Sequence, residues 1–141
     1  MNKTKRNAVA AIVVILIATF GASANAAEPA INNHEMVFKN FKSSLKRTEF
    51  PGIVESTIYT VVEYKNKYPE LNYSDILNEL EAVGRDNDNS SIRYKAHLAS
   101  LYLSDSDGIE VTPVPGAFDH EYLFKQIADQ FEKKFLASHI E

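Results

Sequence analysis

Apolar residues recur at steps of three and four through most of the chain beyond residue 30, with polar residues between them. This spacing is that of one face of an α-helix. It is found in five stretches, at roughly residues 33–47, 51–66, 74–84, 90–103 and 119–135. No stretch alternates convincingly between apolar and polar residues, as a half-buried strand would. The pattern therefore predicts an all-α fold, a small bundle of about five helices.

Particular residues mark where these helices begin and end. Pro51 suits a first helical turn, where its missing N–H costs nothing. Ser74, and then Asn89 or Ser90, have side chains that cap helix N-termini. Gly84 is expected to stop the third helix. Because the connections between the second, third and fourth helices are short, we expect these helices to pack as antiparallel hairpins.

The clearest amphipathic pattern follows a long loop that we predict at about residues 104–118, where prolines and glycines break the helical spacing. Asp119 is expected to cap this last helix. Its predicted apolar stripe contains Leu123, Ile127, Phe131 and Phe135. Charged residues cover its other side, so one face is expected to be buried.

The N-terminus has the features of a bacterial export signal. Basic residues precede an apolar stretch at 8–20, and Ala24-Asn25-Ala26 fits the small-x-small cleavage rule. The apolar stretch is shorter than the roughly 20 residues that span a bilayer. We therefore predict a signal peptide at 1–26 that is cleaved after Ala26, the alternative being an uncleaved anchor. A flexible segment at 27–32 and a single all-α domain at 33–141 would follow, with no later membrane span, in the periplasm or outside the cell.

Charge and cysteine content exclude several classes of function. The chain carries a formal net charge of −4, and removing the signal takes Lys3, Lys5 and Arg6 but no acidic residue, which leaves −7. Phosphate recognition needs clustered Lys and Arg, so we expect no nucleic-acid partner. The chain has no cysteine. Disulfides, thiolate metal sites and a cysteine nucleophile are therefore excluded.

The segment Asp88–Ala96 resembles part of a HEAT-type repeat, in which an Asp turn precedes a helix with an apolar-Arg pair and then Ala and Leu. A second copy is suggested because Val54–Tyr64 can be laid over Ile92–Tyr102 at an offset of 38 residues. Such repeats have a period of about 40. The earlier copy lacks the Asp turn and the Arg, and the match covers about residues 53–103.

The resemblance implies a short stack of antiparallel helix hairpins, a shape that usually binds other proteins. Fewer than three repeats would need capping helices, which the first and last helices would supply. The alternative is a plain helical bundle whose regular packing imitates a repeat.

Metal and catalytic motifs are weak or missing. The four histidines (His34, His97, His120 and His139) have no zinc-binding spacing. The segment 86–97 begins like a calcium loop but lacks its glycine and its final Glu. Asp105, Asp107 and Glu110 would hold a cation only loosely. No nucleophile motif or phosphate loop is present, so we predict no catalytic, cofactor or metal site and expect the protein not to be an enzyme.

Tyrosines suggest a binding surface. Tyr59, Tyr94 and Tyr122 lie off the main apolar stripes, and Arg93 is next to one of them. Exposed tyrosines give rigid contact area with a polar tip. These four residues are the predicted interaction surface of a non-catalytic module that binds another envelope or extracellular protein. The structural alternative is that the tyrosines only seal the edge of the core.

A second hypothesis is a carrier of a small apolar ligand, which a helical bundle can enclose. The first and last predicted helices are rich in phenylalanine. The expected pocket would be lined by Phe38, Phe41, Phe124, Phe131 and Phe135. In the alternative reading, these phenylalanines simply form the core.

The export signal makes a direct prediction. The mature protein from its source should begin at Ala27, because signal peptidase cuts after the small residue at Ala26. The intact mass of the protein, recovered from the envelope fraction, shows where it begins. A mass that retains residues 1–26 would instead indicate the uncleaved anchor.

Overall fold

The computed structural model describes residues 31–112 and 120–139. Within these ranges the chain forms five α-helices and no strand, which confirms the predicted all-α fold. The helices are α1 (Ile31–Leu45), α2 (Pro51–Lys67), α3 (Ser74–Asp86), α4 (Ser90–Ser104) and α5 (His120–Ser138). The predicted signal peptide and the expected cap Asp119 lie outside the described residues. Of the predicted flexible segment 27–32, residues 31 and 32 belong to α1.

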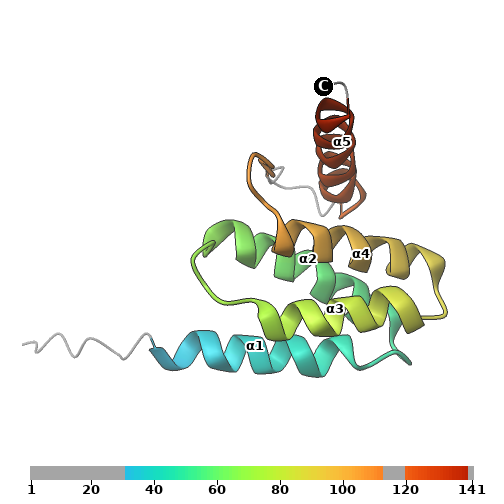
Figure 1. Ribbon diagram of the computed structural model, residues 1–141. Helices are drawn as coiled ribbons and strands as arrows, with labels where there is room; N and C mark the ends of the chain where they lie inside the picture. The colour runs from blue at the N-terminus through green and yellow to red at the C-terminus, as the bar shows by residue number, and fades with distance from the viewer. Residues whose placement is uncertain (1–30, 113–119, 140–141) are drawn as a thin grey trace, which may run out of the picture. The chain divides into compact units, whose positions relative to one another are not determined.

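The first four helices form two stacked hairpins (Figure 1). In one hairpin α1 packs on α2, and in the other α3 packs on α4. The hairpins stack because α1 also packs on α3 and α2 also packs on α4. The fifth helix, α5, packs on α4. This arrangement leaves α4 in contact with three other helices and explains why it carries the most buried residues.

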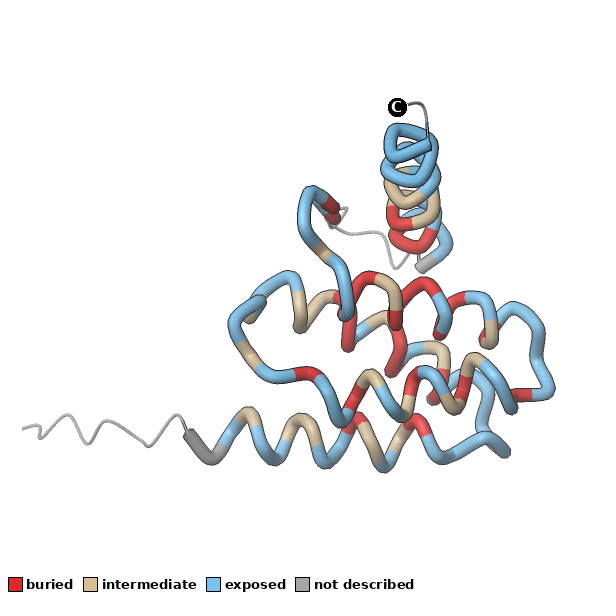
Figure 2. The backbone as a smooth tube through the Cα atoms, in the orientation of Figure 1, coloured by how far each residue is buried: buried red, intermediate tan, exposed pale blue. Residues whose placement is uncertain are grey.

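One hydrophobic core joins all five helices (Figure 2). Its largest fully buried side chains are Leu45, Val54, Ile58, Val61, Val62, Ile76, Leu80, Ile92, Phe124 and Ile127. Positions 38 residues apart in α2 and α4 are buried in both helices, as in the pairs Val54 and Ile92, Ile58 and Ala96, and Val61 and Ala99. The two helices therefore present equivalent faces to the core, each as the second helix of its hairpin.

The prediction that Gly84 stops the third helix is wrong. The helix continues to Asp86, and the N–H of Asn87 donates to the carbonyl of Val83 at 3.1 Å. A Cβ built on Gly84 would lie 3.6 Å from the backbone of Arg93 in α4. This glycine thus lies where the two helices of the hairpin approach closely, rather than at a helix end.

Part of the predicted loop at 104–118 is ordered against α5. Ile109 and Val111 are buried in the core. The side-chain amide of Gln130 accepts from the N–H of Glu110 at 2.9 Å and donates to its carbonyl at 2.6 Å. Gln126 makes the same pair of bonds with Thr112, at 3.2 and 3.1 Å. Two glutamines one turn apart therefore bind an extended backbone as a neighbouring strand would.

The predicted stripe of α5 is buried only in its first half. Leu123 and Ile127 belong to the core, whereas Phe131 is partly buried and the side chain of Phe135 is 61% exposed. The helices and the segment 109–112 cover only the early turns of α5. The described residues 132–139 are all exposed (Figure 2). The expectation that Phe135 is a core residue is therefore wrong.

The N-cap of α4 gives a stability prediction. The Asn89 side chain accepts from the N–H groups of Ser91 and Ile92 at 2.9 and 3.3 Å. Asn89→Ala should lower the free energy of unfolding by about 1 kcal/mol, because these N–H groups lose their acceptor. Urea unfolding followed by circular dichroism measures the change.

The matched controls are Asn89→Asp, which keeps an acceptor, and Ser90→Ala, at the other position that the sequence allowed for the cap. Both should unfold at nearly the wild-type urea concentration. A larger loss from Ser90→Ala than from Asn89→Ala would contradict the assignment of Asn89 as the cap.

Candidate functional site

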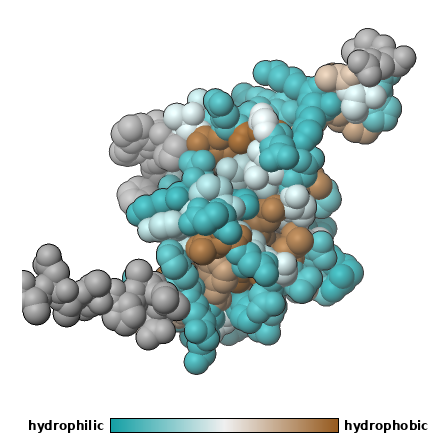
Figure 3. All heavy atoms as spheres, turned by 60° about the vertical axis from the view of Figure 1, so that its left-hand side comes forward, coloured by the Kyte–Doolittle hydropathy of each residue, from teal (hydrophilic) through white to brown (hydrophobic). Residues whose placement is uncertain are grey.

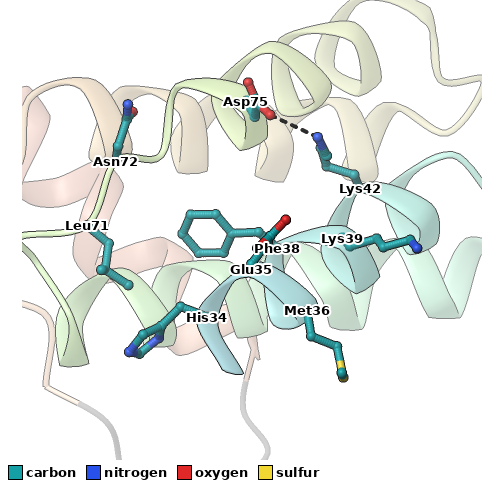
Figure 4. Close-up of a pocket in the computed structure, with 9 residues that line it drawn as sticks. All are labelled: His34, Glu35, Met36, Phe38, Lys39, Lys42, Leu71, Asn72 and Asp75. Carbon is teal, nitrogen blue, oxygen red and sulfur yellow. Dashed lines mark hydrogen bonds and ion pairs between the residues drawn. The ribbon is translucent and has the colours of Figure 1, made fainter. Parts of the chain in front are cut away.

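A groove lies between the N-terminal half of α1 and the start of α3 (Figure 4). We call it the α1–α3 groove; its volume is about 780 Å³. It is lined by His34, Glu35, Met36, Phe38, Lys39, Lys42, Leu71, Asn72 and Asp75. Figure 3 turns this end of the domain forward and shows apolar surface between polar flanks. The groove therefore combines an apolar floor with charged rims.

The floor of the groove is supported by an aromatic cluster. Phe38 packs against Tyr73, with ring centroids 5.1 Å apart, and against Tyr64 at 6.1 Å. The hydroxyl of Tyr64 lies 2.5 Å from Nδ1 of His34. The buried Tyr73 hydroxyl donates to the carbonyls of Tyr64 and Tyr68, at 3.1 and 3.0 Å. Burial raises the pKa of Tyr73, so this hydroxyl remains a donor. These contacts fix the shape of the floor.

Two ion pairs join the α1 side of the domain to α3, and the first of them lies on the rims of the groove. Lys42 on α1 pairs with Asp75 on α3 at 2.8 Å, and Lys46, directly after α1, pairs with Glu79 on α3 at 2.9 Å. The hydrogen bond with Lys42 and its charge lower the pKa of Asp75, while the same contact raises the pKa of Lys42. These two lysines therefore tie the α1 side of the domain to α3. Lys39, also on the rim, makes no ion pair with a described residue.

The four residues of the predicted interaction surface have different surroundings. Tyr94 is 55% exposed and lines a crevice of about 250 Å³ between α4 and α5. Tyr122 is also exposed, on α5. Arg93 donates to the carbonyls of Asn87 and Asp88, at 2.7 and 3.1 Å, and so holds the turn between α3 and α4. Tyr59 packs on the core and donates to Glu63 at 2.9 Å. Tyr94 and Tyr122 are thus the more exposed of the four, whereas Arg93 and Tyr59 are only partly exposed.

The five phenylalanines of the predicted ligand pocket do not converge. Phe38 and Phe41 lie in the aromatic cluster with Tyr64, on the α1 side of the domain. Phe124 is buried and lines the crevice against α4. Phe135 is exposed near the end of α5. Of the five, only Phe38 lines the α1–α3 groove.

In the acidic loop at 105–110, the place of a cation is taken by a lysine side chain of the same chain. The ammonium of Lys134 lies 2.7 Å from both carboxylate oxygens of Asp105 and 3.2 Å from the carbonyl of Asp107. The backbone N–H of Glu110 donates to the side chain of Gln130. Across the described ranges, no three His, Asp or Glu side chains gather as a metal site requires. The loop is therefore tied to α5 by a lysine.

A buried lysine is the main feature that the sequence reasoning missed. The Lys95 side chain is 3% exposed, and its ammonium contacts Glu55 of α2 and Glu121 of α5. Among the described residues, it is the only charged side chain in the core. A signal was present, because Lys95 stands three residues after Ile92 on the buried stripe of α4. A cation at such a position calls for partners from neighbouring helices.

Two opposed effects set the pKa of Lys95. Burial disfavours the ammonium and lowers the pKa, but the hydrogen bonds to Glu121 and Glu55, together with their charges, outweigh it. The pKa of Lys95 is therefore raised above its usual value of 10.5. The group remains charged near neutral pH and joins three helices.

Comparisons of the chain with protein-family models, with curated proteins and with solved structures found no match. Within the described ranges, no helix has the length and apolar character needed to cross a membrane.

The exposure of the three partners predicts an unequal effect of mutation. Glu121 and Glu55 reach water, whereas Lys95 does not. Neutralising both acids (Glu55→Gln with Glu121→Gln) should cost about 3 kcal/mol, since a buried ammonium loses its counter-charges. Lys95→Met should cost about 1 kcal/mol or less, because the two remaining carboxylates are solvated. Chemical unfolding of the three proteins measures the order, and a reversed order would contradict the role of Lys95.

The pH dependence follows from the direction of the shift. Because the folded pKa of Lys95 is raised, its ion pairs contribute their full stability below pH 10.5. The contribution should disappear as the pH rises through the folded pKa. Wild type should therefore lose stability relative to Lys95→Met at high pH. The comparison with this variant cancels the titration of the tyrosines, which both proteins share.

Proposed function

We propose that this protein is an exported, non-catalytic protein-interaction module that holds an apolar segment of another envelope or extracellular protein in the α1–α3 groove. The observation that carries the proposal is the groove itself, an open apolar floor between charged rims. Interfaces commonly have this anatomy of an apolar centre and a polar rim. The predicted signal peptide at 1–26 supports export to the compartment of such a partner.

The chemistry of the rim suggests what the partner presents. Met36 is 62% exposed beside the groove, so it is free to cover an incoming apolar side chain. Lys39 is exposed and has no ion pair among the described residues. In a partner segment, one bulky apolar residue would contact Met36 and a nearby acidic residue would pair with Lys39. Lys42 is less available, because Asp75 holds its ammonium at 2.8 Å.

The rigidity of the groove favours binding. Its floor rests on the Tyr73 hydrogen bonds, and its two walls are joined by the pair of Lys42 and Asp75. A preformed site avoids part of the entropy cost of ordering on association. The two stacked hairpins also agree with the resemblance to HEAT-like repeats, whose surfaces commonly bind proteins.

The alternative function is a carrier of a small apolar ligand. A volume of about 780 Å³ favours it, because pockets for small molecules have about 300–1,000 Å³. The ligand would then occupy the same groove rather than a space between the first and last helices. Native mass spectrometry of protein from its source separates the two functions, because a carrier retains an added mass of a few hundred daltons.

A displayed peptide library panned on the purified protein tests the proposed function. Wild type should enrich peptides that carry a bulky apolar residue near an acidic one. For such a peptide, Met36→Asp or Lys39→Glu should raise the Kd at least tenfold, since a tenfold change corresponds to about 1.4 kcal/mol, within reach of a single buried contact. Both residues are exposed, so the variants should fold normally.

Tyr94→Ser is the matched control, because it removes an equally exposed apolar side chain from a distant surface. It should leave the Kd unchanged. Methyl NMR signals of Met36 and Leu71 should move when the peptide binds. Selected peptides that bind Met36→Asp and Lys39→Glu as well as wild type would contradict the proposal.

A further inference from the structure

We propose that the exposed half of α5 pairs with α5 of a second copy of this chain, in an antiparallel arrangement with two-fold symmetry. The starting point is an apolar surface that the domain leaves uncovered. Phe135 is 61% exposed and Leu136 is 52% exposed, while Phe131 is only partly buried. Figure 1 shows the end of α5 extending away from α4. Aromatic side chains on such a surface commonly mark an interface.

The exposed stripe leads into a hollow at the base of α5. Ala128, Phe131 and Phe135 follow one another at steps of three and four, so they share one side of the helix. Ala128 also lines the crevice between α4 and α5, together with Tyr94 and Phe124. The crevice has a volume of about 250 Å³. One copy therefore carries both an exposed ring, Phe135, and a hollow in which Tyr94, Phe124 and Ala128 lie among polar and charged side chains.

Self-complementary charge identifies the occupant as a second copy. Lys125 and Glu132 lie two turns apart beside the stripe, and neither makes an ion pair with a described residue. In an antiparallel pair of identical helices the same edges meet, so Lys125 of each copy approaches Glu132 of the other. Lys134 differs, because it is already held by Asp105.

One register brings Ala128 against Phe131, Phe135 to the crevice and Lys125 close to Glu132, all at the same time. When Ala128 stands opposite Phe131 of the second copy, a small residue meets a large one on both sides of the two-fold axis. Phe135 of the second copy then stands opposite Phe124, at the crevice that Tyr94 lines. Lys125 comes within two residues, about 3 Å along the axis, of Glu132 of the second copy. The Lys side chain easily spans that distance.

Sedimentation equilibrium of the mature chain over a concentration series tests this pairing. Wild type should form dimers, and Phe135→Ser should raise the dimer dissociation constant at least tenfold. Phe50→Ser is the matched control, since Phe50 is 52% exposed but lies before α2. It should leave the dissociation constant unchanged. Because both rings are exposed, circular dichroism should show that both variants remain folded.

A charge exchange tests the register itself. Lys125→Glu alone and Glu132→Lys alone should each weaken the dimer, because like charges then face one another. The double variant should restore it to within a few-fold of wild type, which a general loss of folding would not allow.

The proposal is overturned if the wild type stays monomeric at every concentration, or if its dimer tolerates Phe135→Ser. A double variant no better than the single ones would overturn the register. If Phe135 instead mediates binding to lipid vesicles by a monomeric chain, the second copy is the wrong occupant. None of these outcomes depends on Met36 or Lys39, so the α1–α3 groove is tested separately.

Discussion

The Lys95 ammonium is buried under α5, and a buried charge is stable only when opposite charges lie beside it. The helices around Lys95 must therefore bring acidic side chains to it. Its two counter-ions come from α2 and α5, which are far apart in the sequence. The lysine thereby determines where the first turn of α5 rests on α4. An apolar side chain at this position would also fill the space, but it would not specify which acidic residues must approach. The last helix is positioned by charge at its start and by glutamine amides along its side.

The two candidate surfaces depend on different parts of this arrangement. The α1–α3 groove belongs to the stacked hairpins, where aromatic rings and the pair of Lys42 and Asp75 fix its walls. The stripe on α5 exists because the domain is too small to cover a helix that extends beyond it. One surface is a groove between two helices, and the other is the exposed side of a single helix that carries Phe135 and Leu136. The two proposed surfaces share no residue, so each proposal stands or falls by itself.

Local spacing was sufficient to predict the five helices and most of their buried stripes, because amphipathic periodicity depends only on the residues of each segment. The features that failed depend on neighbours from elsewhere in the chain. Gly84 resembles a stop until α4 is seen to approach it. Phe135 continues a perfect stripe, but its ring packs against the nearby His139 rather than in the core. Arg93 looked available for binding, yet its guanidinium is bonded to the turn between α3 and α4. Lys95 and the glutamines of α5 acquire their roles only through contacts more than a dozen residues away in sequence.

Because two glutamines of α5 bind backbone amides of the preceding segment, hydrogen exchange at these amides shows whether α5 is attached. The N–H groups of Glu110 and Thr112 are bonded to Gln130 and Gln126, so their shielding from solvent does not come from a regular helix or sheet. If α5 separates from the segment 109–112, both amides become free to exchange with solvent while the hairpins remain closed. Their hydrogen-exchange rates would then give the free energy of detaching one helix, separately from that of unfolding the domain.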